Sequence, residues 1–432
     1  LTSWRLQYAC PNIRGEAYTI YTNTPVGGAM RGYGIPQVCF AIESFMDDVA
    51  NEIHMDPLEF RRKNLIQGYY EDAYLKPIAA NTNGIFECLE KGAEYIHWDE
   101  KRKEYAEQTG DVRKGVGMAL FSYKTGVWPI SLEIAGARLS LNQDGSVQLM
   151  LGATEIGQGA DTVFSQMVAE TLHTDMEHVH IKTVQDTDVS PFDTGAYASR
   201  QSLVTGTAVR HCAEILRDKI LAYAKTLLPE IDTRELTLKD NWIWAGDEQV
   251  ISLAALAEES YYSLTNSSVL TAEVSEQVKK NTIATGCCFA EVEVDIKLGK
   301  IKILHIINVH DSGKLLNPQL AEMQVHGGMS MGMGYGISEQ LILDEKTGRP
   351  LNGNLLDYKL MTMLDTPDIK ADFVELYDPM GPYGNKALGE PPAIPCAPAI
   401  RNAVLHATGV AFYENPLTPQ RLIDGFQKAG LI

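Results

Sequence analysis

The stretch FAEVEVDIKLGKIKILHI (289–306) contains two alternating runs on either side of a Leu-Gly pair. In the first run Glu291, Glu293 and Asp295 alternate with apolar residues, and this period of two is typical of a strand with one buried face. The second run follows a short connection that contains glycine, as the return strand of a hairpin does. The stretch therefore predicts a half-buried β-hairpin.

Helical signals and a second hairpin surround this stretch. Pro36 opens an amphipathic segment, and Asp56-Pro57 supplies the N-cap and the first residue of another helix. Two alternating runs within 135–151 flank Gln143-Asp144-Gly145, which predicts the second hairpin. Further helices are expected over 84–108 and 202–226 and after residues 317, 391 and 418, and an exposed connector is expected at 100–111. Because strands and helices do not alternate regularly, the predicted fold class is α+β.

The composition of the chain argues against several classes of function. Its 432 residues carry a net charge of −19, and such a surface repels phosphate backbones, so we expect no nucleic-acid partner. No run of eighteen apolar residues occurs, so no membrane span is expected, and the first residues lack the pattern of a signal peptide. The seven Cys form no C-x-x-C pair, which predicts reduced thiols and a cytoplasmic location instead of a zinc or iron–sulfur site.

Four glycine-rich loops precede helices, at 27–34, 152–159, 190–201 and 384–390. Glycine lets the backbone approach a ligand closely, and the start of a helix offers unpaired N–H donors. Together the loops could form nests for a large anionic cofactor, although each taken alone is also explained as a turn. The loops contain neither a dinucleotide fingerprint nor a P-loop, which argues against the common nucleotide-binding folds.

The segment KALGEPPAIP (386–395) places a carboxylate, Glu390, between a glycine and two prolines. The prolines fix φ and stiffen the turn, and a general base has to be held rigidly. A charge that favours a helix N-terminus is the alternative interpretation of Glu390. Arg31, in the first glycine-rich loop, could pair with a phosphate or lie at the surface.

In this order the loops resemble the molybdenum-binding region of xanthine dehydrogenase and its relatives, the molybdenum hydroxylases. The resemblance covers about residue 8 to about residue 428, with every block in the family's order. The blocks that carry it are TNTPVGGAMRGYGIPQ (22–37), GATEIGQG (152–159), DTGAYASR (193–200), NPQLAEMQVHGGM (317–329) and KALGEPP (386–392). This combination is specific, whereas no single block is.

The resemblance implies a role for each matching residue. Glu390 would be the catalytic general base, and Arg31 and Ala198 would lie next to the metal through their backbone. Tyr33 would line the substrate slot, with a second position near Val127 and Trp128, where the match is poor. The residues implied to contact the cofactor are Arg31, Gly32, Gly157, Gln158, Gly159, Ala198, Ser199, Gln324 and Gly389.

The resemblance also implies two packed α+β lobes with the cofactor wedged between them. Residues 1–105 would be the tail of the first lobe and 106–432 the second. The cofactor would be molybdenum-molybdopterin, alone or as its cytosine dinucleotide, and its electrons would leave through 2Fe-2S and FAD groups on partner segments. The family's Gly-Gly-Phe-Gly-Gly loop and its substrate-binding Arg fall before Leu1, so we expect an upstream half of the molybdenum subunit as a further partner.

The expected reaction is the hydroxylation of a purine, xanthine or hypoxanthine, with oxygen derived from water. Glu390 would take the proton from that oxygen. The same chemistry on an aldehyde or on an N-heterocycle such as nicotinate is the first alternative, because the substrate slot matches poorly near Trp128. A non-catalytic scaffold subunit is the second alternative, and the presence of Glu390 argues against it.

Overall fold

The computed structural model describes residues 7–67, 70–71, 77–78, 82–182, 184–232 and 235–432. The chain forms two compact units that are interleaved along the sequence. Unit 1 contains residues 1–124, 282–378 and 386–432, and unit 2 contains 125–281 and 379–385. The chain does not pass between these units near residue 105, so the division of the chain into lobes at that point stays a prediction.

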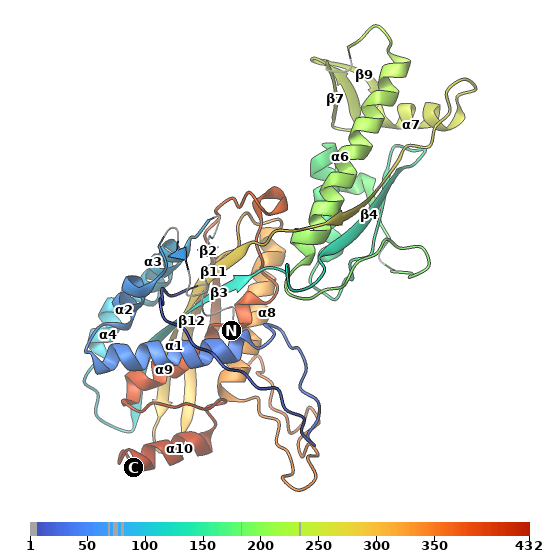
Figure 1. Cartoon of the computed structure of the whole chain (residues 1–432). Coiled ribbons are helices and arrows are strands. Elements are labelled where there is room, and N and C mark those ends of the chain that lie inside the picture. The colour runs from blue at the N-terminus through green and yellow to red at the C-terminus, as the bar shows by residue number, and fades with distance from the viewer. Residues whose placement is uncertain (1–6, 68–69, 72–76, 79–81, 183, 233–234) are drawn as a thin grey trace. The chain divides into compact units, whose positions relative to one another are not determined.

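The predicted hairpin at 289–306 is confirmed and forms the middle of the sheet of unit 1 (Figure 1). Its strands are β11 (Ile283–Asp295) and β12 (Lys300–Asp311), which pair antiparallel. On the other side of β11 lies β3 (Val112–Lys124), also antiparallel, whereas β13 (Asp368–Phe373) pairs parallel with β12. The sheet order is therefore β13-β12-β11-β3.

Helices cover both faces of this sheet, so the expected half-buried strand is only partly correct. On one face Cys288, Ala290 and Val292 belong to a core with α8 (Pro318–Ile337), α9 (Cys396–Thr408) and α10 (Pro419–Lys428). On the other face Cys287 and Phe289 pack with α3 (Ile85–Ile96) and α4 (Trp98–Glu104). The two sets alternate along β11 because successive side chains point to opposite faces.

Glu291 shows why the alternating pattern did not predict which side chains of β11 are exposed. Its side chain was expected in solvent, but it is buried beneath α4. Lys101 Nζ donates to its Oε2 at 2.7 Å and the Tyr105 hydroxyl donates to its Oε1 at 2.7 Å. These bonds compensate the buried charge. The stretch expected as an exposed connector thus includes residues that pack against the sheet, and the helix expected over 84–108 is broken at His97, whose φ is 56°.

The remaining elements of unit 1 precede β3 or follow β13. They are α1 (Ile35–Glu52), α2 (Pro57–Asn64), the strand pair β1 (Tyr70–Glu71) and β2 (Pro77–Ile78), and the 3₁₀ turn η5 (Pro391–Ala393). The predicted N-cap of α2 is confirmed, since Asp56 Oδ1 accepts from Leu58 N at 2.9 Å. No described helix is long and apolar enough to cross a membrane.

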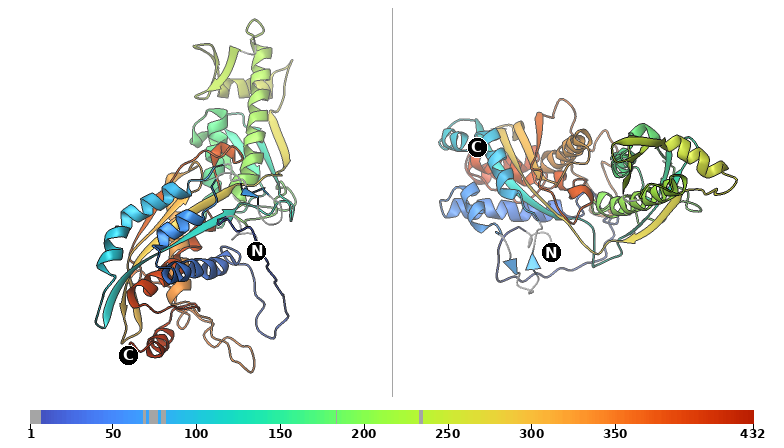
Figure 2. Two further views of the ribbon diagram at one scale, coloured as in Figure 1. Left: turned by 60° about the vertical axis from the view of Figure 1, so that its left-hand side comes forward. Right: turned by 90° about the horizontal axis from the view of Figure 1, so that it is seen from above.

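Unit 2 is built on a second four-stranded sheet, β10-β4-β5-β6. Its strands are β4 (Ile134–Leu141), β5 (Val147–Leu151), β6 (Val179–Ile181) and β10 (Thr271–Gln277), and β4 with β5 is the second predicted hairpin. The long helix α6 (Gln201–Leu227) lies against β4 and β10 (Figure 2). The other elements are α5 (Ala160–Leu172), η2 (Met176–His178), η4 (Pro382–Gly384), α7 (Leu253–Tyr262) and the sheet of β7 (Leu236–Lys239), β8 (Trp242–Ala245) and β9 (Glu248–Ser252). With this mixture in both units, the predicted α+β class is confirmed.

Candidate active-site loops

The turn before α1 holds three successive residues in the left-handed region. Gly32, Tyr33 and Gly34 have φ of 95°, 49° and 83°. Tyr33 N donates to Met30 O at 2.7 Å, and Ile35 N donates to Gly32 O at 2.9 Å. A non-glycine residue in this region costs about 1–3 kcal/mol and is common at functional sites. The turn leaves Tyr33 74% exposed.

The side chain of Arg31 joins three distant segments of unit 1. Its Nε donates to Gly389 O at 2.6 Å, and its Nη2 donates to Gln324 O at 2.9 Å. The side chain is half-buried and bonded to these carbonyls, so it does not lie free at the surface, and a contact with a phosphate stays a prediction. Its guanidinium braces the loop of Glu390 against α8.

Close packing on α8 fixes the backbone that follows Glu390. A Cβ at Gly328 would lie 2.4 Å from Cβ of Pro392, so only glycine permits this approach of η5 to the helix. Asn308 Nδ2, on β12, donates to Pro392 O at 3.0 Å. The rigid turn predicted from the two prolines is therefore held by a helix and a strand.

The start of the same loop is anchored by a buried ion pair. Lys386 Nζ lies 2.7 Å from Asp311 Oδ2, and both side chains are fully buried. Lys386 Nζ also donates to Thr82 O at 2.9 Å, and Gly84 N donates to Asp311 Oδ2 at 2.8 Å. Sequence reasoning missed this pair, although a Lys at the start of an otherwise apolar segment was a usable signal.

Burial shifts the pKa of both Arg31 and His310. Burial lowers the pKa of Arg31, and the nearby charge of Glu390 opposes this shift. Burial also lowers the pKa of His310 to about 3, and the charge of Arg31 acts in the same direction. The His310 ring packs against Phe121 with 4.9 Å between centroids, and the residue is therefore neutral near pH 7.

In unit 2 the loop at 152–159 wraps around a carboxylate of its own. Glu155 Oε1 accepts from Gly157 N at 2.7 Å and Gly159 N at 3.1 Å, and its Oε2 accepts from Asp161 N at 3.1 Å. Partial burial would raise the pKa of Glu155, but these backbone N–H groups lower it overall. The Gln158 side chain faces its own loop, because its Oε1 accepts from Ile156 N at 2.7 Å.

The loop before α6 has two non-glycine residues in the left-handed region in succession. Ala198 and Ser199 have φ of 48° and 49°. Ala198 O accepts from Gly126 N at 2.9 Å, which ties this loop to the one that carries Val127 and Trp128. Both of these latter side chains are half-buried. The structure thus brings the predicted substrate positions of unit 2 next to a predicted cofactor contact.

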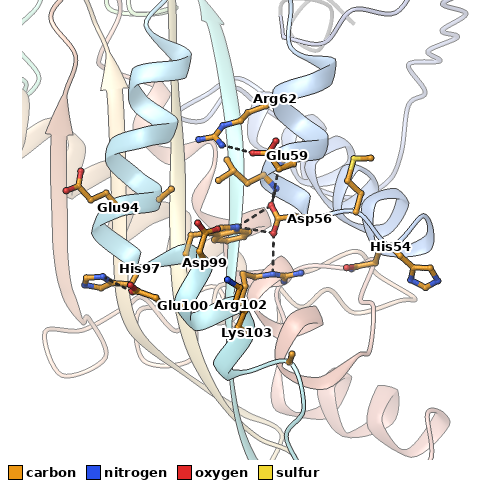
Figure 3. Close-up of a pocket in the computed structure, with 16 residues that line it drawn as sticks. His54, Asp56, Glu59, Arg62, Glu94, His97, Asp99, Glu100, Arg102 and Lys103 are labelled. Carbon is orange, nitrogen blue, oxygen red and sulfur yellow. Dashed lines mark hydrogen bonds and ion pairs between the residues drawn. The ribbon is translucent and has the colours of Figure 1, made fainter.

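A large hollow elsewhere in unit 1 contains none of the predicted site residues. It has a volume of about 780 Å³ and lies among α1, α2, α3 and α4 (Figure 3). Asp56 lies within hydrogen-bonding distance of Trp98 Nε1, at 3.1 Å, and Arg102 is stacked over the Trp98 ring. Arg62 pairs with Glu59, and the hollow is lined by charged side chains of both signs.

The predicted residues fall into a group in each unit, and both groups suit an anionic cofactor. In the loop at 152–159 the N–H groups of Gly157 and Gly159 donate to Glu155. A Cβ at Gly34 or Gly157 would meet nothing within 4 Å, so the backbone at both glycines is open to a ligand. This open backbone is compatible with the close approach of a molybdopterin-type group.

Comparison with known proteins also indicates a molybdopterin cofactor. A family model described as the molybdopterin cofactor-binding domain matches residues 91–367, and a second model with the same description matches residues 2–65. The putative xanthine dehydrogenase molybdenum-binding subunit XdhA of Escherichia coli strain K12 is 49% identical over 96% of this chain and 55% of its own length. The chain therefore spans about half the length of the curated relatives it matches.

Two more distant proteins extend the comparison. The probable hypoxanthine oxidase XdhD of the same organism is 31% identical over 98% of this chain and 44% of its own length. The crystal structure of quinoline 2-oxidoreductase from Pseudomonas putida 86 superposes with a TM-score of 0.84 at 24% identity, covering 93% of this chain and 53% of that one. This last likeness establishes a shared fold.

Proposed function

Because the chain belongs to the molybdenum hydroxylase family and contains its molybdopterin cofactor-binding domains, we propose that it is the catalytic, cofactor-binding part of a purine hydroxylase. The observation that carries this proposal is the bridge made by Arg31. Its side chain links Gln324, 293 residues away, to Gly389, 358 residues away, directly beside Glu390. The segment of Glu390 is thereby joined to the loop of Arg31 and to helix α8, both of which resemble cofactor contacts.

Different residues of the chain would bind the cofactor and transfer the proton. Glu390 would accept a proton from the reacting water-derived oxygen, and the Arg31 guanidinium lies nearby. Within unit 1 the backbone at Gly32 and the side chain of Gln324 would contact the cofactor, and within unit 2 the backbone at Gly157, Gln158 and Ala198 would do so. When bound, molybdenum-molybdopterin supplies Lewis acidity and a two-electron acceptor.

The choice of a purine as substrate rests on the names of the relatives XdhA and XdhD. Tyr33 supports it, because its exposed ring can stack on a planar heterocycle. In this proposal 2Fe-2S and FAD groups on partner chains or domains in the cytoplasm would accept the electrons, and an upstream half of the molybdenum subunit would complete the site. The pterin carries a cytosine dinucleotide or ends at its own phosphate.

The test measures turnover in the purified holoenzyme with a dye acceptor, using xanthine, hypoxanthine, an aliphatic aldehyde and nicotinate. We expect the purines to be preferred, and Glu390→Gln to lower turnover by about 100- to 10,000-fold. Molybdenum and pterin contents should stay at the wild-type level, because the amide keeps the shape of the loop.

Glu345→Gln, at an exposed position, is the control and should leave turnover unchanged. Preference for the aldehyde or nicotinate would reject the purine assignment. Near-normal turnover of Glu390→Gln would reject the general base, and loss of molybdenum from that variant would make Glu390 a structural residue.

A further inference from the structure

A buried ion network in unit 2 lies beneath the loops at 125–133 and 193–200. We propose that its members, Glu133, Asp193 and Arg200, are positioning residues that set the substrate-facing loop relative to the cofactor-facing loop. The inference rests on the proposed function and adds to it three charged residues outside the set that the resemblance implies.

Arg200 is the centre of the network and is fully buried. Its Nε lies 2.5 Å from Glu133 Oε2, and its Nη1 lies 2.6 Å from Asp193 Oδ1. Nη1 also donates to Gly195 O at 3.1 Å, and Nη2 donates to Ile134 O at 2.8 Å. Each nitrogen of the guanidinium therefore bonds to one of the two loops or to the strand that follows the first.

Glu133 connects Arg200 to the backbone of the loop that contains Val127 and Trp128. Its Oε1 accepts from Val127 N at 2.5 Å. A Cβ at Gly126 would lie 2.7 Å from the same oxygen, and Gly126 has a φ of 73°. The carboxylate thus fills the space beneath Gly126 and fixes the backbone that leads to Trp128.

Asp193 connects Arg200 to the backbone of the loop that contains Ala198 and Ser199. Its Oδ1 accepts from Gly195 N at 2.8 Å, and its Oδ2 accepts from Thr205 Oγ1 at 2.7 Å. The two successive left-handed residues between these points are costly and persist only if their surroundings hold them. Arg200 directly follows them, so its bonds restrain the strained segment at one end.

The energetics favour a role in geometry over one in stability. A buried ion network pays a desolvation penalty and often contributes no more to stability than apolar residues of similar volume would. Its bonds nevertheless require one arrangement of the two loops, because every partner has a fixed direction. A displacement of about 1 Å at a site can cost about 100-fold in rate.

The chain contains a matched network for comparison. Arg61, also fully buried, lies 2.8 Å from Glu43 Oε2 and 2.6 Å from Asp47 Oδ1. This network joins α1, α2 and β3 through Glu43, whose Oε2 also accepts from Leu120 N at 2.9 Å. It has the same composition and burial, but its contacts lie outside the loops assigned to cofactor and substrate.

The test compares Glu133→Gln with Glu43→Gln in the holoenzyme, each of which replaces one carboxylate by its amide. We expect both to lower Tm. Glu133→Gln alone should speed amide hydrogen exchange in 125–133 and 193–200, reduce pterin content and raise KM for the purine by about tenfold or more. Thr205→Val, a milder change to the same network, should show these effects to a smaller degree if Glu133→Gln fails to fold.

The outcomes separate this inference from the proposed function. Exchange rates and KM that match the wild type in both Glu133→Gln and Thr205→Val, despite a lower Tm, would overturn the positioning role. Equal changes in Glu43→Gln would also overturn it. A wild-type enzyme without pterin would reject the proposed function, while the exchange rates would still decide whether the network positions the loops.

Discussion

In unit 1 the turn that follows Glu390 is held by close packing against α8, whereas in unit 2 the loops at 152–159 and 193–200 are held by hydrogen bonds to carboxylates. The unit 1 contact depends on Gly328, where a Cβ would lie 2.4 Å from Pro392. The unit 2 loops depend on Glu155 and on the partners of Arg200, whose bonds are directional. A packed contact is sensitive to the volume of the side chains, and a carboxylate contact is sensitive to their charge. We therefore expect different substitutions to destabilise the two sets of loops.

The largest expected effect tests the exception in unit 1, the buried pair of Lys386 and Asp311. Lys386→Met removes the cation and leaves a buried carboxylate without its partner, which should lower the free energy of unfolding by about 3–5 kcal/mol. The control is Lys91→Met, because Lys91 forms an exposed pair with Asp372 worth about 0–1 kcal/mol. Chemical denaturation measures both. Equal losses would show that burial of the pair does not matter.

An intermediate effect is expected when a methyl group is added to the packed helix. Gly328→Ala should destabilise the protein by about 1–3 kcal/mol, because the contact with Pro392 leaves no space. At the neighbouring Gly327 a Cβ would meet only Arg31 Nη1, at 3.6 Å. Gly327→Ala should therefore leave the thermal midpoint unchanged or raise it, since alanine favours a helix. A stable Gly328→Ala variant would contradict the packing argument.

The smallest expected effect concerns Glu155 and depends on pH. The pKa of Glu155 is lowered in the folded protein. Its contribution to the free energy of unfolding is therefore fully present above its pKa in the unfolded chain, about 4.3, and is lost as the pH falls through its pKa in the folded protein. Glu155→Gln should cost about 1 kcal/mol, as the loss of a cap does, and should remove this acid-dependent part. Amide exchange of residues 156–161 between pH 6 and pH 3.5 measures it. A pH dependence equal in both proteins would assign the effect to other groups.

Local features of the sequence predicted much of the fold and the identity of the site loops. The alternation at 289–306, the cap at Asp56 and the turn at Gly145 each depend on neighbouring residues, so they could be recognised without a structure. The order of the glycine-rich loops likewise indicated the family, which the comparisons established. The pattern of one strand reports only its own period, however, and it placed Glu291 in solvent because nothing in that pattern reveals a covering helix.

Tertiary structure alone decided which distant groups meet. Arg31 bonds to a carbonyl 358 residues away, Lys386 pairs with a carboxylate 75 residues away, and Arg200 pairs with Glu133 across 67 residues. The physical reason is that a buried charge needs a partner, yet its own neighbours in sequence do not identify that partner. The sequence by itself determined which loops are rich in glycine and which turn is stiffened by prolines, and the packing of helices on the sheets decided which of their side chains hold the others in place.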